Sequence, residues 1–213
     1  MKFESMVELV GGLPSFDLPL LTQAFAVKRP VLRVQLSRWM KGGKVIGLRR
    51  GMYLLSPTYR RVPLNPVVLA NQLYTPSYLS GLWALGYFDM IPERVVWFTS
   101  VTSRVPRRFE NPVGVFDYRN IKQEYFFGAS MRKVGTQEVL VAEPEKALLD
   151  YWHLTPGEWT ISRLVEMRYQ HHELVSAERL RDFGARFNSP RINLTVERWL
   201  KLAGEESEGW VTV

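Results

Sequence analysis

The chain has 213 residues, no cysteine, a hydrophobic content of 46% and a formal net charge of +7. The hydrophobic content excludes a wholly disordered chain. The lack of cysteine excludes disulfides and thiolate metal sites and fits a reducing compartment. No apolar run reaches the roughly 20 residues that cross a bilayer, and the first residues lack a secretory signal pattern. We expect a soluble, cytoplasmic protein with one large or two small domains and no membrane partner.

The first part of the sequence predicts two helices followed by a third, basic helix. Apolar spacing favours a helix over residues 3–10, and Asp17 followed by Pro19 fits the cap and first turn of a helix over 18–25. Pro30 fits the first turn of a third helix, which should end at Gly42 and Gly43. The apolar stripe of this third helix consists of Leu32, Leu36, Trp39 and Met40.

A basic hairpin follows the third helix. Residues 44–48 and 52–55 predict two short strands joined by the turn Arg49-Arg50-Gly51. The segment 28–61 contains ten basic residues and no acidic one: Lys28, Arg29, Arg33, Arg38, Lys41, Lys44, Arg49, Arg50, Arg60 and Arg61. Residues 1–61 therefore carry 11 basic and 3 acidic side chains, a net charge of +8, whereas residues 62–213 carry 17 basic and 18 acidic ones, a net charge of −1.

Two helices, a basic helix and a basic hairpin are the order of a winged helix-turn-helix. In such a module the third helix enters the major groove and the hairpin contacts the backbone or the minor groove. A merely solvated face normally mixes both charge signs, which this segment does not. We predict that residues 1–61 form a winged helix-turn-helix domain that binds double-stranded DNA through Arg29, Arg33, Ser37, Arg38, Lys41, Lys44, Arg49 and Arg50. Among these, Arg33, Ser37 and Arg38 are the candidates for contacts with base edges.

A proline-rich segment over residues 56–65 predicts the boundary to a second domain, residues 62–213. We expect this domain to be α+β, with a small antiparallel sheet and a helical C-terminal part, which makes the whole chain α+β. The predicted strands are 95–99, 113–118, 125–127 and 138–142. The predicted helices are 67–73, 78–87 behind a Ser77 cap, one from Glu143 with Pro144 in its first turn, 161–169, 177–183 behind a Ser176 cap, and 195–203, followed by an acidic, frayed tail over 204–213.

Catalytic chemistry finds little support in the second domain. A metal-dependent nuclease needs clustered carboxylates beside a lysine, and the candidates are Asp117, Glu124, Glu143, Glu145 and Lys146, with Arg104, Arg107 and Arg108 nearby. Residues 143–146 form a single helical turn, so the first turn of a helix explains them better. The three histidines, His153, His171 and His172, lack metal-ligand spacing. We expect no catalytic residue, no metal and no cofactor.

Several short motifs resemble AbiEi-type antitoxins over residues 25–155. In the N-terminal part they are Leu36-Ser37-Arg38-Trp39, Gly43-Lys44, Leu48-Arg49-Arg50-Gly51 and Tyr53. In the second part they are Asn65-Pro66, Pro76-Ser77-Tyr78-Leu79-Ser80, Ala84-Leu85, Ile91-Pro92-Glu93, Val101-Thr102 and the run from Ala142 to Asp150. The order and spacing of these motifs carry the resemblance, because each one alone is weak.

This resemblance implies a transcriptional regulator and antitoxin of a type IV toxin–antitoxin system linked to abortive phage infection. Such proteins repress their own operon at inverted repeats and counteract a nucleotidyltransferase toxin without a stable complex. The first antitoxin surface to test would be Glu143, Glu145, Lys146 and Asp150. Two alternatives stay open from the residues themselves: a nucleic-acid-processing enzyme such as a nuclease, and a regulator whose second domain senses a small ligand.

Overall fold

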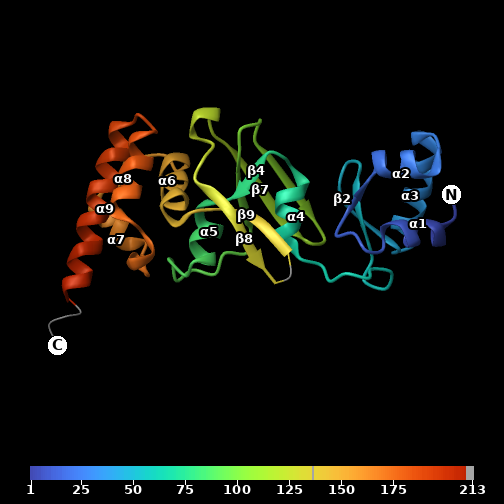
Figure 1. The fold of residues 1–213 in the computed structure, drawn as a ribbon, viewed down its shortest axis with the longest axis horizontal. Coiled ribbons are helices and arrows are strands. Elements are labelled where there is room, and N and C mark those ends of the chain that lie inside the picture. Colours follow the sequence, from blue (N-terminus) through green and yellow to red (C-terminus); the bar gives the residue numbers. More distant parts are fainter. Residues whose placement is uncertain (136, 210–213) are drawn as a thin grey trace.

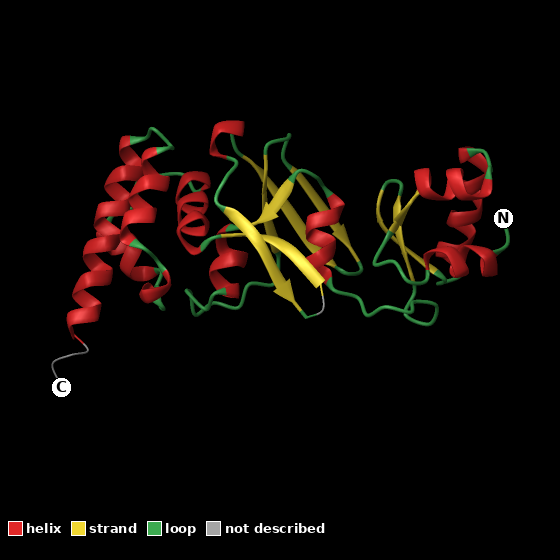
Figure 2. Cartoon of the chain, viewed as in Figure 1, coloured by secondary structure: helices red, strands yellow, loops and turns green. Residues whose placement is uncertain are grey.

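The computed structural model describes residues 1–135 and 137–209, and for residues 206–209 the backbone only. Its elements lie in three parts along the long axis of the molecule: helices with a small sheet at the N-terminal end, a larger sheet in the centre, and helices at the C-terminal end (Figure 1). Figure 2 shows that the strands are confined to the first two parts. The fold class is α+β, as the sequence predicts.

The N-terminal part runs helix, strand, helix, helix, strand, strand. Its elements are α1 (Phe3–Val10), β1 (Phe16–Asp17), α2 (Leu18–Phe25), α3 (Arg29–Lys41), β2 (Val45–Arg49) and β3 (Met52–Leu55). The strands form an antiparallel sheet in the order β1-β3-β2. The three predicted helices and the hairpin are confirmed, whereas the two residues of β1 are too few to show a periodic pattern.

Local chemistry sets the ends of α2 and α3. The Asp17 carboxylate accepts a hydrogen bond from the backbone N–H of Leu20 at 2.9 Å, which satisfies a group that has no partner within the helix. Pro30 lies in the first turn of α3, and Gly43 adopts the left-handed conformation just after the last turn, with φ of 68°. That conformation costs glycine little, so the chain can turn at once into β2.

The hairpin of β2 and β3, which we call the shared hairpin, packs against two separate cores. Tyr53 and Leu55 lie in the small core formed with α1, α2 and α3. Leu48, Met52 and Leu54 belong to the large core of the central part. Successive side chains of a strand point to opposite faces, so β3 presents one row of side chains to each core. The two cores therefore meet across this hairpin, and residues 56–65, which form no helix or strand, lead from it to the central part.

The central part is built on a six-stranded mixed sheet in the order β6-β7-β5-β4-β9-β8. Its strands are β4 (Ser77–Leu79), β5 (Phe98–Thr102), β6 (Arg107–Asn111), β7 (Gly114–Asn120), β8 (Ala129–Val134) and β9 (Gln137–Ala142). β4 runs parallel to β9 and β5 runs parallel to β7, while the other neighbours are antiparallel. The prediction of a small antiparallel sheet was wrong in size and direction, because the composition of a strand does not report which strand pairs with it.

Several predicted boundaries in this part were also wrong. Ser77 opens strand β4 instead of capping a helix, and helix α5 (Gly81–Tyr87) begins after Ser80. The strand predicted over 95–99 forms as β5, three residues later. Residues 125–127 form no strand, because Tyr125 ends the short 3-10 helix η1 (Gln123–Tyr125) and the next two residues belong to no helix or strand. Strands β6 and β8 were missed because they are the two edges of the sheet, where charged side chains interrupt apolar alternation.

Helices cover both faces of the central sheet. On one face lies α4 (Pro66–Leu73), whose Ala70 carbonyl accepts a hydrogen bond from the Tyr118 hydroxyl of β7 at 2.6 Å. On the other lie α5 and α6 (Pro144–Leu154), and the Asp150 carboxylate of α6 accepts hydrogen bonds from the hydroxyls of Tyr78 and Ser80. α6 starts with Glu143 and Pro144, as predicted.

The C-terminal part packs against α6 and consists of α7 (Ile161–Glu166), the 3-10 helix η2 (His172–Leu174), α8 (Ala177–Ala185) and α9 (Pro190–Gly209). The predicted Ser176 cap is present, since its hydroxyl accepts a hydrogen bond from Arg179 N. α9 begins before the predicted helix 195–203 and continues to Gly209. The predicted end of this helix at residue 203 was therefore wrong, and residues 210–213 of the predicted tail lie outside the described residues.

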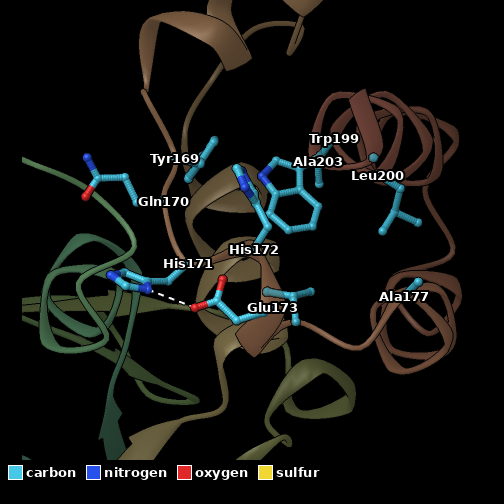
Figure 3. A pocket seen from close by; sticks show the side chains of 11 residues that line it. Tyr169, Gln170, His171, His172, Glu173, Ala177, Trp199, Leu200 and Ala203 are labelled. Atoms are coloured by element: carbon cyan, nitrogen blue, oxygen red, sulfur yellow. Dashed lines mark hydrogen bonds and ion pairs between the residues drawn. The ribbon is translucent and has the colours of Figure 1, made fainter. Parts of the chain in front are cut away.

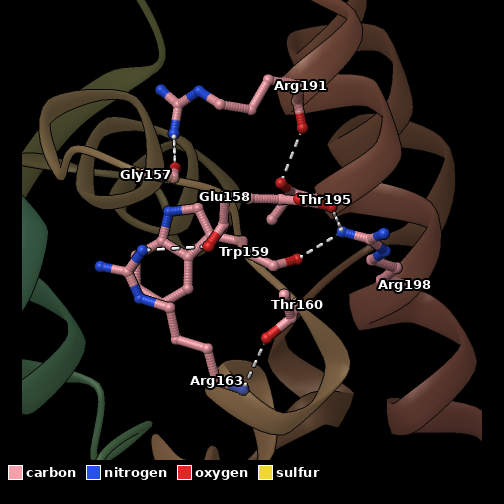
Figure 4. A network of polar contacts seen from close by, with 8 residues as sticks. All are labelled: Gly157, Glu158, Trp159, Thr160, Arg163, Arg191, Thr195 and Arg198. Atoms are coloured by element: carbon pink, nitrogen blue, oxygen red, sulfur yellow. Dashed lines mark hydrogen bonds and ion pairs between the residues drawn. The ribbon is translucent and has the colours of Figure 1, made fainter.

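Arg191 fastens α9 to the C-terminal end of α6 (Figure 4). Its guanidinium donates hydrogen bonds of 3.0–3.3 Å to the carbonyl oxygens of Trp152, His153, Thr155 and Gly157. The last carbonyls of a helix have no partner within it, and a cation is favoured there by the helix dipole. Within the described residues, no helix is both long enough and apolar enough to cross a bilayer.

Candidate functional site

Four arginines line a concave site of about 560 Å³ in the N-terminal part. Arg29 and Arg33 come from the first turns of α3, and Arg49 and Arg50 come from the tip of the shared hairpin. We call these four residues the arginine site. The rest of its wall consists of Asp17, Leu18, Pro19, Gly51 and Tyr53.

Backbone contacts hold the two sides of the arginine site together. The Leu18 N–H at the start of α2 donates to the Gly51 carbonyl at 3.1 Å. Gly51 has a φ of 82°, in the left-handed region that favours glycine, so the hairpin turn can approach α2 closely. The turn that carries Arg49 and Arg50 is thereby fixed beside the first turns of α2 and α3.

The cations of this region have no carboxylate partners. Within the part of the chain that the structure describes, every Lys or Arg ion pair lies beyond residue 61, so none of the ten basic residues from 28 to 61 is neutralised by one. The one carboxylate in the wall, Asp17, caps α2. Four like charges around one concavity attract an anion strongly, because the field of each adds to the others.

The exposed face of α3 continues this surface. Arg33, Arg38 and Lys41 are exposed and Ser37 is half-buried, whereas the apolar stripe points into the small core. Met40 departs from the prediction, because it is 37% exposed at the edge of that stripe.

Lys44 lies apart from the arginine site. Its ammonium sits 4.6 Å from the centroid of the Phe3 ring, beside α1. None of the five wall residues, including Leu18 and Tyr53, was among the predicted DNA contacts. Their only signal in the sequence is that they adjoin the helix cap and the basic turn.

The predicted antitoxin surface does not exist as a surface. Glu145, Lys146 and Asp150 are at most 1% exposed, and Glu143 pairs with Arg132. The Glu145 carboxylate accepts a hydrogen bond from Ser176 N at 2.8 Å. These side chains therefore join α6 to its neighbours, and only Glu143 is accessible to a partner. The prediction was wrong because the helix is apolar on both sides of these charges and is covered by the sheet and by α8.

Lys146 and Asp150 form a buried ion pair one helical turn apart. Asp150 also accepts hydrogen bonds from Tyr78 at 3.0 Å and from Ser80 at 2.7 Å. Burial lowers the pKa of Lys146, and the charge and hydrogen bond of Asp150 oppose this shift. Every polar atom of the carboxylate is thus satisfied, as a buried charge requires.

The carboxylates of the nuclease alternative do not converge. Asp117 pairs with Arg119, Glu124 with Lys122, and Glu143 with Arg132. Among the described residues, no group of three or more His, Asp or Glu side chains is placed to hold a metal ion.

Two of the histidines lie beside a second concavity, of about 690 Å³, in the C-terminal part (Figure 3). His171 Nδ1 lies 2.9 Å from a Glu173 carboxylate oxygen, and the His172 ring packs 5.3 Å from the ring of Trp199. His153 lies elsewhere, between the rings of Tyr125 and Phe187. The three histidines are therefore not gathered at one site.

Comparison with known proteins adds no assignment. A scan of protein-family models and a search of curated proteins gave no match to this chain. A function can therefore be inferred only from the geometry of the site and from the motif resemblance.

Proposed function

We propose that residues 1–61 are a winged helix-turn-helix module and that the chain binds duplex DNA through the arginine site and the exposed face of α3. The observation that carries the proposal is the set of four arginines around one concavity, all without a carboxylate partner. The order of helices and strands and the basic tip of the hairpin support the same assignment. Guanidinium groups suit this role because they bind phosphate oxygens in a bidentate manner.

The position of each basic residue indicates which part of the DNA it contacts. Arg29, Arg49 and Arg50 line the concavity and contact phosphates, which supply affinity and register. Arg33, Ser37 and Arg38 lie on the outer face of α3, or on its flank, and contact base edges in the major groove. Lys41 and Lys44, at and beyond the C-terminal end of α3, add long-range attraction.

The cellular role that we propose is an antitoxin that represses its own operon and counteracts a nucleotidyltransferase toxin, in the cytoplasm and without enzymatic activity of its own. This part rests on the resemblance of residues 25–155 to AbiEi-type antitoxins. It requires a nucleotidyltransferase gene beside this one, and co-expression of the present chain should restore growth of cells that express that toxin. A chain that binds DNA but fails to restore growth would leave a regulator without antitoxin function.

The DNA-binding proposal is tested by fluorescence anisotropy on a duplex from the upstream region of the gene and on a random duplex. If five to eight cations contact phosphates, log K should fall with log salt with a slope of about −5 to −7. The double variant Arg49→Glu/Arg50→Glu should weaken binding to both duplexes equally. The control Arg94→Glu/Lys201→Glu makes the same change of charge at exposed residues outside the site, and should bind nearly as the wild type does. A slope near zero would remove the proposal.

A further inference from the structure

The shared hairpin lies against the β6–β7 turn of the central sheet. The Asn111 side-chain amide donates a hydrogen bond of 3.1 Å to the Leu48 carbonyl. The pairing of β2 with β3 shifts register between Gly47 and Arg49, so Leu48 falls at the irregularity. An irregularity of this kind leaves backbone groups without a hydrogen bond to the neighbouring strand. Here the Leu48 carbonyl accepts its hydrogen bond from Asn111 of the central part instead.

A third concavity, of about 350 Å³, lies where the N-terminal and central parts meet at this point. It is lined by Arg49 and Arg50 on one side and by Glu110, Asn111 and Pro112 on the other. Because Arg49 and Arg50 also belong to the arginine site, the concave surface runs from α3 over the tip of the hairpin and onto the end of β6.

The two faces of β6 carry different kinds of side chain. Arg108 and Glu110 lie on one face, where their charged groups are 3.7 Å apart and Arg108 sits 4.3 Å from the centroid of the Trp97 ring. Phe109 points to the other face and packs against Tyr74, and Arg107 shares that face because side chains alternate along a strand.

We propose that duplex DNA bound at the arginine site continues over the β6–β7 turn, where Arg108 contacts a backbone phosphate and Glu110 repels one. This inference rests on the proposed DNA-binding function. Arg108 is three residues from Asn111, about 10 Å along the strand, which is the rise of about three base pairs. A duplex that touches Arg49 and Arg50 therefore needs only a short extension to reach it.

The state of Arg108 suits a phosphate contact. Its side chain is 47% exposed and that of Glu110 is 72% exposed, and an ion pair in such solvent contact holds its partners weakly. The guanidinium can leave Glu110 for a phosphate while the face of Trp97 keeps it in place. Glu110 lies between Arg108 and the hairpin arginines and disfavours phosphate at its own position. Repulsion of this kind restricts the registers that the duplex can take.

Duplex DNA is a better occupant than a protein partner because the surface is continuous with the arginine site, and Arg49 and Arg50 line both concavities. If a protein partner bound this face instead, it would contact Trp97 and Arg108, and substitution of Arg108 would leave the affinity for DNA unchanged. The two occupants are separated by single substitutions on β6 that leave the N-terminal region intact.

The test uses the full chain and anisotropy with a 30-base-pair duplex at 0.15 M salt. Loss of one phosphate contact in Arg108→Gln should raise Kd about fivefold and reduce the salt slope by about 0.9. Arg108→Lys, which keeps the charge, should stay within about twofold of the wild type. Glu110→Gln should lower Kd about two- to threefold, because one repulsive charge is removed. Arg107→Gln, an exposed arginine on the opposite face of the same strand, should leave Kd unchanged.

Failure of this inference can be told apart from failure of the proposed DNA-binding function. If the wild type shows no salt-dependent binding, DNA binding itself is wrong and this inference falls with it. If the wild type binds but Arg108→Gln and Arg107→Gln have equal effects, the duplex does not cross this face and only this inference is overturned. An unchanged or weakened affinity of Glu110→Gln would overturn it as well. Melting temperatures equal to that of the wild type would show that each variant is folded.

Discussion

The N-terminal region and the rest of the chain differ in whether their charged side chains form ion pairs. Residues 28–61 leave ten cations without a carboxylate, whereas the ion pairs of Lys and Arg in the described chain all lie beyond residue 61. One of these pairs, Lys146–Asp150, is completely buried. The proposed function assigns the charges of one sign at the surface to an external partner, whereas the buried charges of both signs are explained by the contacts of the fold. The predictions below test how far this contrast holds.

The largest effect is expected from cutting the chain at the boundary. A fragment of residues 1–61 keeps the +8 charge but leaves Leu48, Met52 and Leu54 without the core that buries them. Burial of three such side chains contributes roughly 5–9 kcal/mol, which is as large as the whole stability of a domain of about 60 residues. The fragment should be unfolded by circular dichroism and should bind DNA far more weakly than the full chain. Cooperative thermal unfolding of the isolated fragment would show that the two regions are independent.

The next effect concerns the buried pair. Lys146→Met leaves the Asp150 carboxylate buried without its counter-charge, and should lower the free energy of unfolding by about 3–5 kcal/mol. The matched change Arg33→Met, at an exposed cation, should cost less than about 0.5 kcal/mol while weakening DNA binding. Urea unfolding with an unchanged m-value would measure both. The double variant Lys146→Met/Asp150→Leu should recover part of the lost stability, because no unpaired charge remains buried. A further loss of stability would instead mean that other contacts of the pair, such as the hydrogen bonds that Asp150 accepts from Tyr78 and Ser80, also stabilise the fold.

The smallest effect is a pH dependence from His153. Burial lowers its pKa below the ordinary value of 6.5; Asp150 opposes this shift, and Arg191, Lys146 and Lys122 add to it. Below pH 6.5 the unfolded chain therefore binds a proton that the folded chain does not. Stability should rise with pH up to about 6.5 and then stay level with respect to this group. Melting temperatures between pH 5 and 8 should show this slope, and His153→Gln should flatten it. An identical slope in the variant would assign the dependence to other groups.

The sequence predicts elements well where chain-local chemistry decides them. Asp17, Pro30 and Gly43 mark the ends of α2 and α3, and these residues act through neighbours within one or two turns. The exposed face of α3 could be predicted for the same reason. The pairing of strands could not, because β4 and β5 find partners far along the chain and their residues carry no record of the partner.

The candidate site was predictable in its cations but not in its walls. Arg49 and Arg50 stand out by the sign of their charge and by their place in a turn, whereas Leu18 and Tyr53 join the wall only because the hairpin packs against the start of α2. The burial of Glu145 and Lys146 was missed because charge suggests exposure, although the apolar residues on both sides of them indicate a helix that is covered all round. The run of four apolar residues over 52–55 carries a similar signal, since a strand buried on both faces does not alternate.

The shared hairpin also orders events during synthesis of the chain. Residues 1–61 leave the ribosome first, but the core that receives Leu48 and Met52 includes β7, which ends at Asn120. At translation rates of about 5–20 residues per second, this strand follows several seconds later. A polypeptide that terminates early in this interval carries all ten cations of the segment 28–61 and yet cannot fix the turn that presents Arg49 and Arg50. Under the proposed function, DNA binding therefore arises only in chains whose synthesis has passed well into the central sheet, and prematurely ended products should not compete with the finished protein.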